Sequence, residues 1–140
     1  MLMPHNMGSR IEHARPVTVH PIRNTVDAET LDTMPKKDII TVLCWIDNNI
    51  YADPHCCTIK DSYQLKHMVE ADTGVYLTNN QFKHAMLLCG YGPVDASELN
   101  WDYCISRDSA IFAWGRPDGA GKITKRDIEN FLEKYPQYHD

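Results

Sequence analysis

One central segment constrains the fold of this chain more than any other, because it contains two short helical patterns joined by a tight turn. Apolar residues recur at helical spacing over 62–73 and again over 79–89. Gly74 ends the first pattern at the position where helices often take up the left-handed conformation. Thr78 and Gln81 then form a capping box, in which each side chain binds a backbone N–H at the helix start. This order predicts a helix-turn-helix unit.

A longer helical pattern precedes this unit, over about 35–50. Pro35 suits its first turn, where the missing N–H of proline has no consequence, and Asp32 or Thr33 is expected to provide the cap. The residues expected to face the core, at helical spacing, are Ile39, Val42, Leu43, Ile46 and Ile50.

Two further elements are predicted in the C-terminal part of the chain. Two aromatic and β-branched runs around a polar turn predict a β-hairpin at about 101–114. Thr124 and Asp127 form a second, weaker capping box, which predicts a helix over about 125–135. Pro136 follows this helix and prevents its continuation.

These elements predict a mainly α fold with a small β-hairpin: a three-helix, helix-turn-helix-like core, then the hairpin, then a C-terminal helix. This is the element order of a winged helix. Residues 33–140 are expected to form a single helical domain. Residues 1–32 contain several prolines and no sustained apolar period, which predicts a flexible N-terminal arm. The alternative for the arm is an ordered strap that lies on the domain.

The formal net charge of −5 argues against indiscriminate DNA binding, which relies on basic residues to neutralise phosphates. Acids and bases balance over 60–92, however. No apolar run is long enough to span a membrane, and the first fifteen residues lack the apolar stretch of a secretory signal. The five cysteines are odd in number and lack the spacing of a disulfide framework. This favours reduced thiols and a cytoplasmic protein.

The leading functional hypothesis is a small regulatory protein that binds DNA site-specifically. In a helix-turn-helix unit the second helix enters the major groove, where asparagine pairs with adenine and lysine with guanine or phosphate. The polar residues expected on the outer face of helix 79–89 are Asn79, Asn80, Lys83 and His84. Backbone phosphates would be contacted by Tyr76, Arg107 and Lys60. A homodimer is expected, because one acidic module offers few phosphate contacts. The alternative for both asparagines is a purely local role at the helix start.

The second hypothesis is a module that docks on a partner protein through an aromatic surface. Aromatic residues are enriched at interface hot spots. The residues expected to form this surface, around the predicted hairpin, are Trp101, Tyr103, Phe112 and Trp114. The alternative is that part of this group covers the helical core.

No pattern for catalysis, metal binding or a cofactor is found, so a non-enzymatic protein without a cofactor is expected. His55, Cys56 and Cys57 share a loop, but adjacent cysteines would strain a tetrahedral zinc site. The segment 116–127 is similar to a calcium-binding loop that has lost most of its acidic ligands. A glycine-rich turn that leads into a capped helix is expected there. An enzyme that uses Cys56 or Cys57 is the lowest-ranked alternative.

Several short motifs run through the centre of the chain: Leu65-Lys66-His67, Gly74 with Tyr76, Thr78-Asn79, Phe82-Lys83, Ala85-Met86, Gly90-Tyr91 and Leu99-Asn100-Trp101. With these motifs, the string 62–106 resembles small uncharacterised proteins from phages and mobile elements of Gram-positive bacteria. The resemblance covers about the central third of the chain. It implies a biological setting for the protein and no particular mechanism.

Overall fold

The computed structural model describes residues 30–52, 60–113, 116–117 and 119–139. Within these ranges the α-helices are α2 (Lys36–Asn49), α3 (Ser62–Thr73), α4 (Asn79–Leu88) and α5 (Lys125–Lys134). Short 3-10 turns add η1 (Leu31–Thr33), η2 (Ala110–Phe112) and η3 (Pro136–Tyr138). The predicted mainly helical fold is confirmed, and the four predicted helices begin and end within two residues of the expected bounds.

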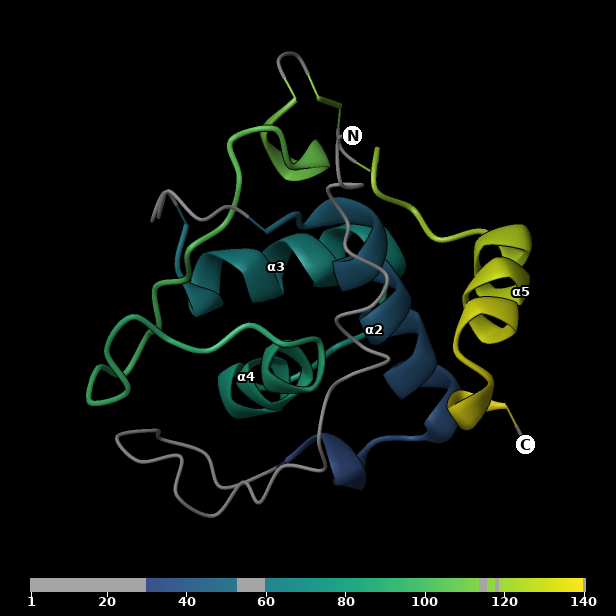
Figure 1. Cartoon of the computed structure of the whole chain (residues 1–140), viewed down its shortest axis with the longest axis horizontal. Helices are drawn as coiled ribbons and strands as arrows, with labels where there is room; N and C mark the ends of the chain where they lie inside the picture. The colour runs from purple at the N-terminus through teal and green to yellow at the C-terminus, as the bar shows by residue number, and fades with distance from the viewer. Residues whose placement is uncertain (1–29, 53–59, 114–115, 118, 140) are drawn as a thin grey trace.

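Helix α2 occupies the centre of the fold, where it contacts α3, α4, α5 and η2 (Figure 1). Such a helix needs apolar residues on most of its circumference. Accordingly the unbroken run from Val42 to Ile46 is buried, which includes Trp45 outside the predicted stripe. Ile39, inside that stripe, is only half-buried. Neither Asp32 nor Thr33 caps α2 as predicted, because both belong to η1 and Pro35 occupies the N-cap position.

The turn between α3 and α4 has the predicted local structure. Gly74 is the C-cap of α3, with a φ of 76°, and its N–H donates to the Glu70 carbonyl. Thr78 and Gln81 form the complete capping box of α4. Asp61 and Gln64 form another at the start of α3. Both ends of this turn are therefore held by hydrogen bonds within the chain, which makes it a defined structure rather than a loose linker.

The predicted hairpin at 101–114 is not found in the part of it that the structure describes, 101–113. Isolated antiparallel bridges instead pair Ile105 with Ala52 and Asp102 with Asp61. The backbone of 101–106 thus pairs with 51–52 and 61–62 and, at Asp102, with Val94, and the residues after it turn into η2. The winged-helix arrangement expected from the hairpin is absent from the described residues, and Trp114 lies outside them.

The loop before α5 is tied to the core by a buried ion pair. Arg116 Nη2 lies 2.6 Å from Asp72 Oδ2, which also accepts a 2.7 Å hydrogen bond from the Trp45 indole N–H. A Cβ atom at Gly121 would overlap both partners of the ion pair. The glycine of the predicted calcium-like loop is thus required here by the close approach of a protein carboxylate and guanidinium.

Helix α5 packs on the side of α2 away from α4 (Figure 1). The buried Asp47 carboxylate on α2 lies 3.0 Å from Lys134 Nζ and accepts a 3.3 Å hydrogen bond from the Tyr135 hydroxyl. The capping box of Thr124 and Asp127 is formed as predicted. Of the predicted N-terminal arm, 1–29 lie outside the described residues, and Thr30, Leu31 and Asp32 are ordered against the domain. No described helix is long and apolar enough to cross a membrane.

Candidate functional site

The outer face predicted for helix α4 is wrong, because the structure places its side chains in the interior. The exposed fractions of the four residues predicted to read DNA bases are 9% for Asn79, 3% for Asn80, 0% for Lys83 and 3% for His84. Helix α4 contacts α2, α3 and η1. The segment that contains Leu99 and Trp101 covers a further side of it. A short helix that is covered on this many sides keeps no free face for a DNA groove.

Three of these buried polar residues, Asn79, Lys83 and His84, make contacts that join α4 to other segments. The Lys83 ammonium lies 4.8 Å from the centroid of the Trp101 ring, a cation–π contact. The Asn79 amide donates to Asn100 Oδ1 and, at 3.3 Å, to the Leu99 carbonyl. His84 Nδ1 accepts a 3.1 Å hydrogen bond from the Leu31 N–H. These residues attach distant segments to α4.

The three residues predicted to contact phosphates are at the surface, but on separate segments. Tyr76 is 85% exposed in the α3–α4 turn. Arg107 is exposed in the loop before η2, and Lys60 is half-buried in front of α3. These three residues therefore do not form one continuous surface with helix α4.

The predicted aromatic surface is also buried for the greater part. Trp101 and Tyr103 are in the core, and Phe112 is half-buried. Burial, followed by the nearby Asp61 carboxylate, raises the pKa of the Tyr103 phenol well above its ordinary value. The expectation of an exposed aromatic cluster is thus wrong for Trp101 and Tyr103, because 101–106 runs through the core instead of forming a hairpin.

A groove of about 460 Å³ lies beside the α3–α4 turn and was not expected from the sequence. The residues that line it come from α3, the turn, the start of α4 and the following loop: Tyr63, Lys66, Leu77, Thr78, Asn79, Leu99 and Asn100. Tyr63 and Leu99 are 49% and 42% exposed, whereas Leu77 is buried. The groove is therefore apolar at its base and has two large apolar side chains at the surface.

A second hollow, of about 480 Å³, shares Leu77 and Thr78 with this groove. Its other lining residues include Met34 and Pro35 from the segment before α2, and Tyr76. The turn between α3 and α4 thus separates two neighbouring depressions.

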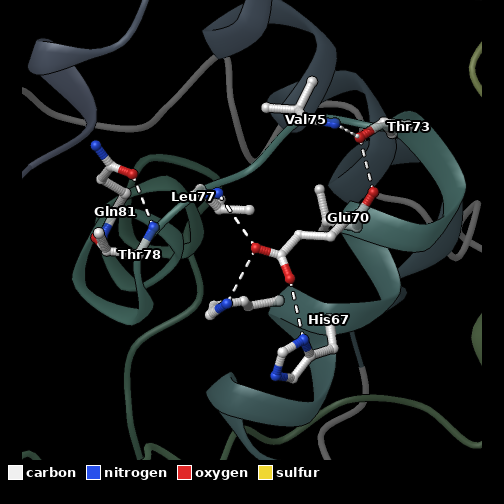
Figure 2. A network of polar contacts seen from close by, with 9 residues as sticks. His67, Glu70, Thr73, Val75, Leu77, Thr78 and Gln81 are labelled. Atoms are coloured by element: carbon white, nitrogen blue, oxygen red, sulfur yellow. Dashed lines mark hydrogen bonds and ion pairs between the residues drawn. The ribbon is translucent and has the colours of Figure 1, made fainter.

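Figure 2 shows the polar network that holds this turn. The Glu70 carboxylate lies 3.0 Å from both Lys66 Nζ and His67 Nδ1, and accepts a 3.4 Å hydrogen bond from the Leu77 N–H (Figure 2). Thr78 donates its backbone N–H to Gln81 Oε1 at 2.8 Å (Figure 2). Because side chains of both helices fix its backbone, the turn presents a preformed surface.

The acidic loop 91–103 forms one side of the groove. It carries exposed Asp95, Glu98 and Asp102 and contains no lysine or arginine. The Ser97 side chain and backbone N–H both bond to Asp95, which lowers the pKa of that carboxyl. Two large apolar residues of this loop are exposed, Val94 at 57% and Leu99 at 42%, and of the two only Leu99 lines the groove. The sequence does not distinguish them, so it could not have placed the groove.

The described residues also bear on metal ligands and on the cysteines. They contain no group of three or more His, Cys, Asp and Glu side chains that could hold a metal ion. Cys44 and Cys89 are free and buried, whereas Cys104 is disulfide-bonded, which corrects the expectation of reduced thiols throughout. Disulfides persist mainly in oxidising compartments, so the cysteines no longer favour the cytoplasm. His55, Cys56 and Cys57 lie outside the described residues.

Comparisons of this chain with protein-family models, with curated proteins and with solved structures found no match.

Proposed function

We propose that this protein is a non-enzymatic interaction module, which holds a short segment of a partner protein in the groove beside the α3–α4 turn. The observation that carries the proposal is the exposure of Tyr63 and Leu99 on a groove whose base is the apolar Leu77. Large apolar side chains at the rim of a depression are typical of binding sites rather than of inert surface. We thus retain the hypothesis that the module docks on a partner protein. The contact surface is now this groove instead of the aromatic residues around 101–114.

The charge of the groove's surroundings indicates the chemistry of the partner segment. The charged residues of the adjoining loop 91–103 are all acidic, and the chain as a whole has a net charge of −5. Lys66 is the basic residue that lines the groove, and its ammonium is paired with Glu70. A segment with an aromatic or aliphatic residue flanked by arginine or lysine would satisfy both features, since its apolar side chain enters the groove and its cations face the loop.

A peptide library displayed on phage and selected on the full-length protein tests this proposal. We expect enrichment of peptides that combine a large apolar residue with basic neighbours, and weaker binding as salt rises. The variant Leu99→Ser should weaken an enriched peptide about tenfold, which corresponds to the loss of part of a buried leucine contact.

Val94→Ser provides the matched control. Val94 is 57% exposed in the same loop, but it does not line the groove. Both substitutions leave the charge unchanged, so a loss confined to Leu99→Ser assigns the contact to the groove. Equal binding by the wild type and Leu99→Ser, or no enriched peptide at all, would overturn the proposal.

DNA binding through the outer face of α4 forms no part of this proposal, because the four side chains are buried. Site-specific DNA binding by other residues, such as Arg107, stays a prediction, as does a homodimer. Selection from a random-sequence DNA pool with the same protein sample tests the former. An enriched DNA sequence, with no enriched peptide, would replace the interaction module with a DNA-reading one.

A further inference from the structure

The segment 30–35, here called the strap, is held against α4 by a hydrogen bond that only one protonation state of a histidine permits. Leu31 is buried, and its backbone N–H donates to His84 Nδ1 at 3.1 Å. A ring nitrogen accepts a hydrogen bond only when it carries no proton. His84 must therefore be neutral, with its proton on Nε2, as long as the strap is attached in this way.

A second contact places the strap on α4 without depending on pH. Gln81 Nε2 donates to Thr33 Oγ1 at 2.9 Å, and Gln81 itself is fixed by its capping box with Thr78. The strap is therefore fastened at two points one helical turn of α4 apart, of which only the Leu31–His84 contact involves a group that titrates near neutral pH.

The surroundings of His84 favour its neutral form. His84 is 3% exposed, and burial lowers its pKa, against the weaker opposing field of Asp32 on η1. Three carboxylates on the helices packed against α4 are paired with cations, whereas Asp38 of α2 lines the hollow that Gln81 also borders. Glu70 on α3 pairs with Lys66, Asp72 on α3 pairs with Arg116, and Asp47 on α2 pairs with Lys134. The neighbouring Lys83 ammonium lies over the Trp101 ring.

We propose that the strap detaches from α4 when His84 takes up a proton, which uncovers the apolar slot now filled by Leu31. The proton comes from solvent and adds to Nδ1, so that two N–H groups face each other where a hydrogen bond existed. The Leu31 N–H then bonds to water, and the imidazolium becomes hydrated in the open state. Since Thr33, Met34 and Pro35 line the hollow beside Tyr76, release of the strap also removes one wall of that hollow.

The sign of the pH effect follows from the direction of the pKa change. With the strap open, His84 regains an ordinary pKa of about 6.5. Above that pH both states are neutral and the strap is fully attached. Below it the open state binds a proton that the closed state does not, so the ratio of closed to open molecules falls roughly tenfold per pH unit until the lowered pKa of the closed state is reached.

Amide hydrogen exchange of the full-length protein, measured by NMR between pH 7.5 and 5, tests this inference. The protection factor of the Leu31 amide is expected to fall with pH below about 6.5, by up to tenfold per unit. The amides of Gly74 and Tyr135, bonded within α3 and at the end of α5, are expected to keep theirs. A parallel loss at all three positions would signify unfolding of the whole domain and overturn the inference.

Two variants separate His84 from the other histidines. In His84→Asn the amide oxygen takes the place of Nδ1 as a non-titrating acceptor, so Leu31 protection should become independent of pH. His67→Asn, which alters an exposed histidine on α3, should leave the pH dependence unchanged. Should His84→Asn fail to fold, NMR titration of His84 in the wild-type chain decides the matter. A pKa at or above 6.5, or Leu31 protection that does not vary with pH in the wild type, contradicts the proposal.

Discussion

Gly121→Ala is the substitution for which the structure allows the most definite prediction. The backbone of Gly121 lies directly against the buried pair of Asp72 and Arg116. An added methyl group would overlap Asp72 Oδ2 and Arg116 Nη2, and would also lie 3.0 Å from Asn49 Oδ1. Asp72 cannot withdraw, because it is fixed on α3 and bonded to Trp45. The arginine must therefore leave, or the loop must move.

The magnitude follows from the burial of the carboxylate. The Asp72 side chain is 1% exposed and that of Arg116 is 13% exposed. Loss of one partner from a buried ion pair destabilises a protein by about 3–5 kcal/mol. Because the Trp45 N–H still donates to Asp72, we expect the lower end of this range, about 3 kcal/mol. For a domain of this size that corresponds to a melting temperature lower by roughly 12 °C.

Urea denaturation followed by circular dichroism measures this difference. Gly92→Ala is the matched control, because a Cβ atom there meets nothing within 4 Å and the glycine does not have a positive φ. Both variants reduce the entropy of the unfolded chain alike, so the comparison removes that contribution. Gly92→Ala should remain within about 0.5 kcal/mol of the wild type. If Gly121→Ala is as stable as Gly92→Ala, the ion pair does not depend on the absence of a side chain at 121, and the reasoning is refuted.

Two further predictions concern a thiol and a helix cap. Burial, followed by the fields of Asp127 and Asp47, raises the pKa of the Cys44 thiol to about 12, so this residue should resist iodoacetamide at pH 8 in the native protein and react after unfolding in urea. Peptide mapping by mass spectrometry measures this, and rapid labelling of Cys44 in the native state would contradict the burial. Thr78→Ala removes the side-chain oxygen that caps α4 and should lower the free energy of unfolding by about 1 kcal/mol, whereas Thr78→Ser retains the oxygen and should restore most of it. Equal stability of the alanine and serine variants in urea would show that the cap contributes nothing.

The helices could be predicted because their signals are local. The capping boxes at Thr78 and Thr124 and the left-handed Gly74 involve residues within a single turn of chain. Such patterns are decided by backbone geometry and by hydrogen bonds over three or four residues, whatever the rest of the molecule does. The hairpin predicted at 101–114 is not found over its described part, 101–113, for the opposite reason, since strand pairing depends on which distant segment lies alongside.

The candidate site could not be predicted from the sequence, because exposure depends on contacts between distant residues. Polar side chains at helical spacing on α4 have the pattern of a solvent-facing surface, yet Trp101 covers Lys83 and the backbone of Leu31 binds His84. Conversely, Leu99 is a large apolar residue, a type usually found in the core, but it lies exposed at the rim of a groove.

The sequence by itself determined where the helices begin and end, because capping and left-handed glycines act within a few residues. Only the tertiary structure decided which faces are open, because a side chain is buried or exposed according to segments that the fold brings from far along the chain. Leu31 and His84 are separated by 53 positions, and Asn79 and Asn100 by 21. The surface proposed to bind a partner is what these long-range contacts leave uncovered.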